Sequence, residues 1–176
     1  MIRPKISDKL LLACVIAFGL TLSSCHTTKK IKPQTHHTKV EHLHIGKPTK
    51  TQKRIIDEAM TWLGTPYKYA GAEKKKGTDC SGMVLRVYEK VTGESLPRNS
   101  AKQAEYCRSI KRTQVEPGDL VFFATGKDPD KISHVGIIID DDHFIHASSS
   151  KGVVISDLTT NYYQRTFKKF GRVPGM

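Results

Sequence analysis

One cysteine and its neighbours have the residue types of a nucleophilic catalytic site. Cys80 follows Thr78 and Asp79, two residue types that cap helices, and an apolar pattern with helical spacing begins directly after it. We therefore expect Cys80 in the first turn of a helix, where free backbone N–H groups and the helix dipole favour a thiolate over a thiol. A thiolate beside a histidine is the arrangement that an activated cysteine nucleophile requires.

Two histidines in the second half of the chain could act on this cysteine. His134 and His146 flank an expected turn at 140–142, in a hairpin of two strands. If the turn is centred on its first or second aspartate, both histidines lie on one face, directly opposite or one diagonal apart. One could then act as a base toward Cys80, and the other could accept its second ring proton. His143 has the opposite parity and should point away.

The first half of the chain has helical periodicity. An apolar stripe predicts an amphipathic helix over 52–63, with Gly64 as its C-terminal cap. A second helix should run from Thr78 or Asp79 to Gly93. A capping-box pattern between Ser100 and Gln103 then predicts the start of a short third helix.

The second half changes to the periodicity of strands. Turn signals and β-branched runs predict at least five short strands, at 120–123, 135–139, 143–147, 152–155 and 170–173. Helices followed by strands indicate an α+β domain, in which N-terminal helices pack on an antiparallel sheet of five to six strands.

The N-terminal residues resemble an export signal. Basic residues precede an eleven-residue apolar stretch, residues 10–20, which is too short for a spanning helix of about 20 residues. The stretch ends in Leu22-Ser23-Ser24-Cys25, which resembles the bacterial lipobox. We therefore expect a lipoprotein signal peptide over 1–24 and a lipidated Cys25. The alternative is an ordinary secretory signal with an incidental cysteine.

Residues 25–50 are expected to form a flexible tether between the lipid and a domain at 51–176. They are rich in threonine, lysine and histidine, a composition that buries too little apolar surface to fold. More than one acyl chain on Cys25 would anchor the tether stably to a membrane. Five histidines here could chelate a transition metal, although nothing fixes their geometry: His26, His36, His37, His42 and His44.

The net charge of +12 does not indicate a nucleic-acid-binding protein. Residues 51–176 carry 20 basic and 15 acidic side chains of alternating sign, so the expected domain is only mildly basic. A nucleic-acid-binding surface would need a basic stripe and a matching motif, and the sequence has neither.

Five motifs in order resemble the NlpC family of papain-like bacterial cell-wall cysteine peptidases. They are residues 78–84 (TDCSGMV), 96–98 (LPR), 117–123 (PGDLVFF), 133–137 (SHVGI) and 144–148 (FIHAS). The resemblance covers about residues 53–174 and implies a papain-like fold. It further implies a lipid-anchored peptidoglycan endopeptidase of the cell envelope that acts as a monomer on stem peptides and needs no cofactor or metal.

The resemblance also assigns roles to particular residues. Cys80 matches the family's nucleophile, His134 the general base, and His146 the third residue, which orients the base. Tyr67 matches a tyrosine near the oxyanion site, with Tyr69 as a competitor for that position. Family members cut within stems or at the crosslinks between stems. The absence of an SH3-like targeting domain resembles the lipoprotein members that cleave crosslinks.

Three other interpretations remain open at the level of sequence. Cys80 and Cys107 could form a structural disulfide in an oxidising compartment. Cys80, His134 and His146 could instead bind a catalytic zinc ion. The domain could also be a non-catalytic module that binds the cell wall.

Overall fold

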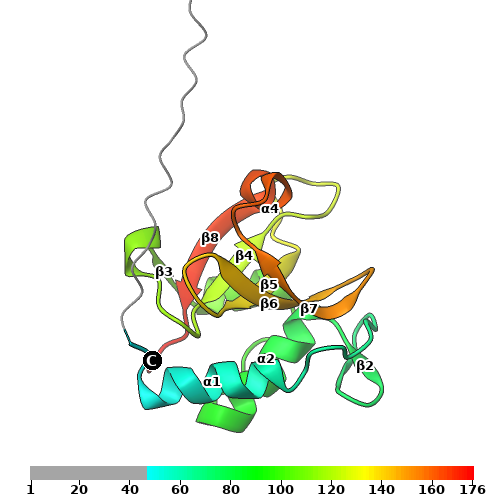
Figure 1. Ribbon diagram of the computed structural model, residues 1–176. Coiled ribbons are helices and arrows are strands. Elements are labelled where there is room, and N and C mark those ends of the chain that lie inside the picture. The colour runs from blue at the N-terminus through cyan, green and yellow to red at the C-terminus, as the bar shows by residue number, and fades with distance from the viewer. Residues whose placement is uncertain (1–46) are drawn as a thin grey trace, which may run out of the picture. The chain divides into compact units, whose positions relative to one another are not determined.

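The computed structural model describes residues 47–176 (Figure 1). Its α-helices are α1 (Lys50–Met60), α2 (Cys80–Thr92), α3 (Ser100–Tyr106) and α4 (Asn161–Thr166), and a 3-10 helix spans Arg112–Gln114. Two short strands, β1 (Ala72–Glu73) and β2 (Gly77–Thr78), form a hairpin. The remaining strands are β3 (Arg108–Ile110), β4 (Leu120–Phe123), β5 (His134–Ile138), β6 (His143–Ser148), β7 (Gly152–Asp157) and β8 (Phe167–Arg172).

These last six strands form one antiparallel sheet in the order β3-β8-β4-β5-β6-β7. The predicted α+β class is therefore confirmed, with six strands in the sheet. In Figure 1, α1 and α2 lie together below the sheet, and α4 lies above it, away from these two helices. Strand β3 and helix α4 were absent from the predicted elements because both are short and carry no clear apolar period.

The sheet is buried on both faces. Along β4, Leu120 and Phe122 pack into the cluster that contains the helices, whereas Val121 and Phe123 pack into a second cluster on the other face. All four side chains are fully buried. This two-sided burial explains why β4 is continuously apolar and does not alternate with polar residues.

The ends of two helices differ from the predictions. The first helix begins at Lys50, because Thr49 and Gln52 form a reciprocal capping box, and it ends at Met60, before the expected residue 63. The third helix is capped by the Asn99 side chain, and the predicted Ser100–Gln103 capping box is wrong. The Gln103 amide is buried and donates instead to the carbonyl oxygens of Ser81 and Pro97.

The second helix follows its prediction closely. The Asp79 side chain caps its N-terminus, and Gly93 ends it in the left-handed conformation at a φ of 77°. Glycine adopts this conformation without steric cost, so the helix stops there.

The expected signal peptide, Cys25, the tether histidines and the tether itself up to residue 46 lie outside the described residues. Among the residues that the structure does describe, no helix is both long and apolar enough to cross a membrane.

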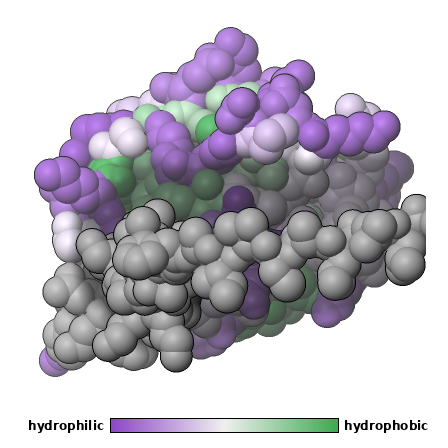
Figure 2. Space-filling view, turned by 90° about the horizontal axis from the view of Figure 1, so that it is seen from above, coloured by the Kyte–Doolittle hydropathy of each residue, from purple (hydrophilic) through white to green (hydrophobic). Residues whose placement is uncertain are grey.

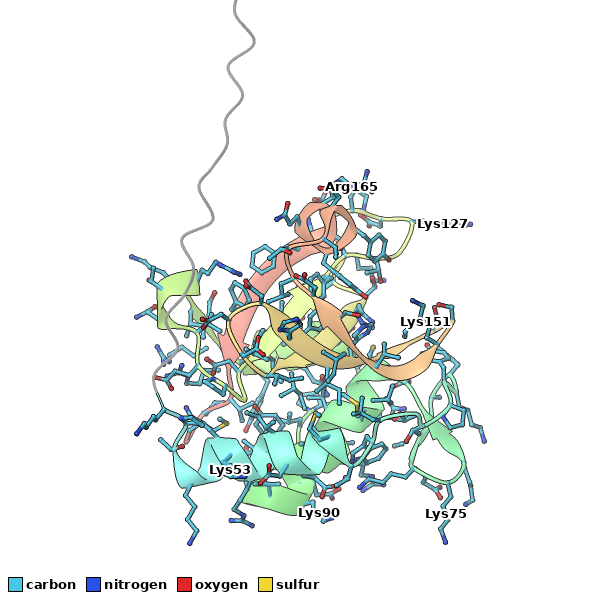
Figure 3. The ribbon with its side chains drawn as sticks, in the orientation of Figure 1. Lys53, Lys75, Lys90, Lys127, Lys151 and Arg165 are labelled. Atoms are coloured by element: carbon cyan, nitrogen blue, oxygen red, sulfur yellow. The ribbon has the colours of Figure 1, made fainter. Side chains whose placement is uncertain are left out.

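Cationic side chains are spread over several sides of the domain. Figure 3 shows Lys53 and Lys90 near the two long helices, Lys75 on the β1–β2 hairpin loop, and Lys127 and Arg165 toward the opposite end. Hydrophilic residues form the raised parts of the face in Figure 2, and hydrophobic residues lie lower between them.

Candidate active site

The start of α2 holds Cys80 in a rigid position. The backbone N–H of Gly82 donates to Asp79 Oδ1 at 2.7 Å, which closes the first turn. A Cβ atom on Gly82 would lie 2.2 Å from the carbonyl oxygen of Gly71, so only glycine lets the helix start approach this loop so closely. The structure thus confirms that Cys80 occupies the first turn and that Asp79 is the N-cap.

Both carboxylate oxygens of Asp79 accept hydrogen bonds from neighbouring segments of the protein. Arg98 donates to both of its carboxylate oxygens, at 2.8 and 3.0 Å. The backbone N–H of Ala70 also donates to Asp79 Oδ2 at 2.9 Å, and the Ser81 hydroxyl donates to Oδ1 at 3.1 Å. Asp79 therefore joins the β1 loop, the helix start and the segment after α2, which agrees with a capping role.

The predicted lowering of the Cys80 pKa is wrong. Burial raises the pKa of the thiol to about 11, and the negative charge of Asp79 raises it further. Backbone N–H groups of Val135, Ser81 and Cys80 face the sulfur and act in the opposite direction, but burial outweighs them. Desolvation disfavours the charged form of a group. Cys80 is therefore a neutral thiol in the resting protein.

The register of the β5–β6 hairpin brings the two histidines together. Ile137 pairs with Ile145 and Ile138 with Phe144, which places His134 and His146 on one face, one diagonal apart. Their rings meet with His134 Nε2 and His146 Nδ1 2.8 Å apart. The predicted parity is confirmed.

The third histidine of the hairpin lies elsewhere. His143 is exposed, and its Nδ1 lies 2.8 Å from Asp140 Oδ1 in the turn. Its opposite parity keeps it out of the histidine pair, as predicted.

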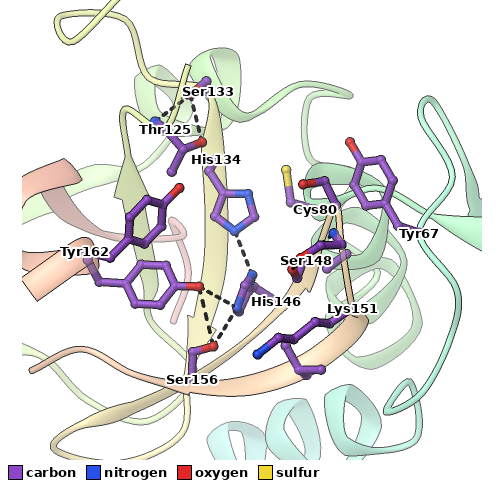
Figure 4. A pocket seen from close by; sticks show the side chains of 15 residues that line it. Tyr67, Cys80, Thr125, Ser133, His134, His146, Ser148, Lys151, Ser156 and Tyr162 are labelled. Carbon is purple, nitrogen blue, oxygen red and sulfur yellow. Dashed lines mark hydrogen bonds between the residues drawn. The ribbon is translucent and has the colours of Figure 1, made fainter. Parts of the chain in front are cut away.

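His134 lies between Cys80 and His146, with Nδ1 on the side of the cysteine sulfur (Figure 4). Burial lowers the pKa of His134 to about 4 and, together with the neighbouring His134, lowers the pKa of His146 to about 3. Both imidazoles are therefore neutral at neutral pH. When His134 donates its Nε2 proton to His146, its Nδ1 is free to accept the thiol proton.

Two further side chains contact the histidine pair and were not predicted from the sequence. His146 Nε2 lies 2.9 Å from the Ser156 hydroxyl and 3.1 Å from the Tyr163 hydroxyl. Ser156 could have been found by parity, because β6 and β7 pair with Phe144 opposite Ser156. Tyr163 comes from α4, for which the sequence offers no comparable signal.

The two candidate tyrosines lie in different environments. Tyr67 lines the same pocket as Cys80, and a bridge to Thr78 holds it beside the strand that precedes α2. Burial raises the pKa of Tyr67, so its hydroxyl is protonated and can donate. Tyr69 is 84% exposed and does not line the pocket. The geometry favours Tyr67 over Tyr69.

The pocket next to Cys80 has a volume of about 440 Å³. Hydroxyl groups dominate its lining, and no aspartate or glutamate contributes to it. Lys151 is the one lysine or arginine among the lining residues (Figure 4). The pocket therefore suits a ligand that carries negative charge and accepts hydrogen bonds.

The disulfide and zinc interpretations do not agree with the structure. Cys80 and Cys107 are both free and buried, and Cys107 is the C-terminal cap of α3. Within residues 47–176, no three histidine, cysteine or acidic side chains are grouped so that they could hold a metal ion. The facing nitrogens of His134 and His146 instead form a hydrogen bond with each other.

The chain is similar to known proteins over most of its length. Residues 64–172 match the model of the NlpC/P60 family. The chain is 33% identical to "Murein DD-endopeptidase MepS/Murein LD-carboxypeptidase" of Escherichia coli K12, over 90% of this chain and 89% of that protein. It is 41% identical to "Probable endopeptidase NlpC" of the same organism, over 68% of this chain and 76% of that protein.

A solved structure shares the fold. A Staphylococcus aureus protein described as similar to lipoprotein, of the NLP/P60 family, matches with a TM-score of 0.65 and 34% identity over 72% of this chain. The present chain spans 42% of that protein's length.

Proposed function

Because the chain belongs to the NlpC/P60 family, we propose that it is a thiol-dependent peptidoglycan endopeptidase held on a membrane by a lipid on Cys25. The murein endopeptidase names of its Escherichia coli relatives support peptidoglycan as the substrate and hydrolysis as the reaction. The protein is thus a hydrolase of the cell envelope.

The single observation that carries the catalytic assignment is the 2.8 Å contact between His134 Nε2 and His146 Nδ1. This contact leaves Nδ1, which lies on the side of Cys80, as the nitrogen of His134 that can act as a base (Figure 4). We assign Cys80 as nucleophile, His134 as base and acid, and His146 as the residue that orients His134.

The reaction begins from neutral side chains. As Cys80 Sγ attacks the carbonyl carbon of the substrate amide, its proton passes to His134 Nδ1. The backbone N–H of Cys80 and the Tyr67 hydroxyl are the proposed donors to the developing oxyanion, a type of contact that stabilises such transition states strongly.

The second half of the reaction regenerates the enzyme. The C–N bond breaks as the His134 imidazolium returns its proton to the leaving amine, which leaves a thioester on Cys80. His134 then takes a proton from water, and the resulting hydroxide attacks the thioester carbonyl. The C–S bond then breaks, which releases the carboxylic acid product, and the His134 imidazolium returns its proton to Cys80 Sγ to restore the thiol.

The pocket lining suggests which part of peptidoglycan binds there. Stem peptides carry free carboxylates, and Lys151 offers the pocket a positive charge that no acidic lining residue neutralises. We therefore assign Lys151 to a substrate carboxylate. For the scissile bond we propose the crosslink between stems, consistent with the DD-endopeptidase name of one relative.

The proposed domain organisation lets the catalytic domain act at a distance from its lipid anchor. Residues 1–24 would be removed as a signal peptide, Cys25 would carry the lipid, and residues 25–50 would link it to the catalytic domain at 51–176. A flexible segment of this length has a typical end-to-end distance of about 25–30 Å, more if it is extended. This distance would let an anchored enzyme work on the wall beside its membrane.

The decisive experiment incubates purified peptidoglycan with a soluble form of residues 26–176 and with its Cys80→Ala variant. Products are identified by mass spectrometry, with and without a metal chelator. We expect loss of crosslinked species, abolished by Cys80→Ala and unaffected by the chelator. Cys107→Ala is the matched control, because this buried cysteine lies outside the pocket and should leave activity in place.

Other product patterns would change the proposal. Shortened stems without loss of crosslinks would keep the thiol mechanism and move the cut within the stem. Chelator-sensitive hydrolysis would contradict the thiol mechanism. A folded, reduced protein that binds peptidoglycan without cleaving it would identify a binding module.

A further inference from the structure

We propose that Ser156 and Tyr163 are positioning residues that hold His146 in the one tautomer in which His134 can act as a base. This inference rests on the proposed peptidase function, since it concerns how the same site is prepared for proton transfer. It adds Ser156 from β7 and Tyr163 from α4 to the Cys80–His134–His146 arrangement.

The two hydroxyls meet the far side of the His146 ring. Ser156 Oγ lies 2.9 Å and Tyr163 Oη 3.1 Å from His146 Nε2. His146 is only 2% exposed, so its Nε2 has little access to solvent water. In the part of the chain that the structure describes, these two hydroxyls are the partners of that nitrogen.

Proton placement along this chain of hydrogen bonds is constrained. For His134 Nδ1 to accept the Cys80 proton, the neutral His134 ring must carry its proton on Nε2 and donate it to His146 Nδ1. His146 Nδ1 must then be unprotonated, which puts the proton of the neutral ring on Nε2. That N–H needs an acceptor, because a buried unpaired donor is costly.

The hydroxyl pair can supply this acceptor. The Tyr163 hydroxyl reaches Ser156 Oγ at 3.5 Å and can donate its proton there, which leaves both oxygens with lone pairs toward His146 Nε2. Ser156 also lines the pocket, where its own proton can find a partner. In the opposite tautomer, His134 would carry its proton on Nδ1 and could not receive the thiol proton.

Aromatic packing fixes the ring for this contact. Phe144 stacks on His146 with 4.8 Å between ring centroids and an angle of 24°. The Tyr163 ring meets Phe144 edge-on at 4.8 Å. Since packing already holds the ring plane, removal of the hydroxyls should alter the tautomer more than the position of His146.

The test compares Ser156→Ala, Tyr163→Phe and the double variant in the soluble enzyme, residues 26–176. We expect the double variant to lower kcat about tenfold to a hundredfold, with KM nearly unchanged, because only proton placement is affected. Ser156→Thr, which restores a hydroxyl, should recover most of the kcat lost in Ser156→Ala. Tyr106→Phe is the matched control, because the Tyr106 hydroxyl contacts Glu94 and the residue does not line the pocket.

A spectroscopic readout separates this inference from the proposed function. In protein labelled with ¹⁵N-histidine, NMR should show His146 protonated on Nε2 in the wild type and a mixture of tautomers in the double variant. Wild-type kcat and an unchanged His146 tautomer in the folded double variant would overturn the inference. Absence of any hydrolysis by the wild type would contradict the proposed function, and the NMR comparison would still decide the tautomer.

Discussion

Two opposing electrostatic effects act on the pKa of Cys80. Backbone N–H groups at the start of α2 and from Val135 favour the thiolate, whereas burial favours the thiol. The histidines experience the same desolvation, which lowers the pKa of both imidazoles. With no carboxylate among the lining residues, the pocket offers no negative side chain to stabilise an imidazolium. The pair should therefore rest as thiol and imidazole and should separate charge only during attack.

This resting state predicts the pH dependence of alkylation at Cys80. A pKa of about 11 leaves little thiolate at neutral pH, so the rate of reaction with iodoacetamide should rise about tenfold per pH unit from pH 6 to pH 9. His134→Ala should change this profile little, since His134 does not hold a thiolate at rest. A rate that is already at its plateau at pH 6, and that falls in His134→Ala, would indicate a preformed ion pair instead.

Lys151 provides a test of substrate charge at the residue scale. We expect Lys151→Ala to raise KM for a stem-peptide substrate by up to about fivefold and to leave kcat nearly unchanged, because an exposed lysine contributes a modest ion pair. Lys75→Ala removes the same charge from the β1–β2 loop, outside the pocket, and is the matched control. An equal effect of both substitutions would mean that the general charge of the protein, and not Lys151, attracts the substrate.

At the scale of elements, non-local contacts hold the strands and helices that carry the site. Asp79 and Arg98 join the start of α2 to the segment that follows the helix. Asp119, between the turn at 117–118 and β4, is fully buried, and Arg172 at the end of β8 donates to both of its carboxylate oxygens at 2.7 Å. The Pro-Gly-Asp motif thus has a structural role, because the carboxylate of Asp119 binds Arg172 and so links β8 to the start of β4.

Breaking this buried pair should destabilise the sheet. Arg172→Ala leaves the Asp119 carboxylate buried without its cation, and we expect a loss of about 3–5 kcal/mol in the free energy of unfolding. Chemical denaturation of the soluble enzyme measures this loss. Lys53→Ala, which breaks an exposed ion pair with Asp57, should have a far smaller effect. Similar losses for the two variants would argue against a structural role for the buried pair.

At the scale of the whole molecule, the proposed active site is assembled from distant parts of the chain. The loop before α2 contributes Tyr67, the helix contributes Cys80, the central strands contribute the histidines, and α4 contributes Tyr163. The expected lipid and tether precede all of these elements in the sequence. Anchoring and catalysis should therefore be separable.

The proposed anchor can be tested by labelling. Cells that express the full chain should incorporate radioactive palmitate into the wild-type protein and not into Cys25→Ser. Cys80→Ala serves as the control, because loss of the proposed catalytic thiol should not affect lipidation. Equal labelling of the wild type and Cys25→Ser, or no labelling of the wild type, would contradict lipidation at Cys25.

The sequence by itself determined the features that depend on neighbouring residues. The end of α2 at Gly93 follows from glycine conformation. Capping chemistry narrowed the N-cap of α2 to Thr78 or Asp79, and the two-residue period of strands placed His134 and His146 on one face for a turn centred on Asp140 or Asp141. Each of these rules acts over a few residues, so the printed order of the chain is sufficient to apply it.

Only the tertiary structure decided the features that depend on what packs around a residue. Burial reverses the expected pKa shift of Cys80. The buried Gln103 amide donates to a backbone carbonyl oxygen, and Asn99 replaces Ser100 as the cap of α3. Tyr163 contacts His146 from a helix that local sequence patterns do not predict. Desolvation and long-range hydrogen bonds come from segments that are distant in the chain. No pattern within a short stretch of sequence contains that information.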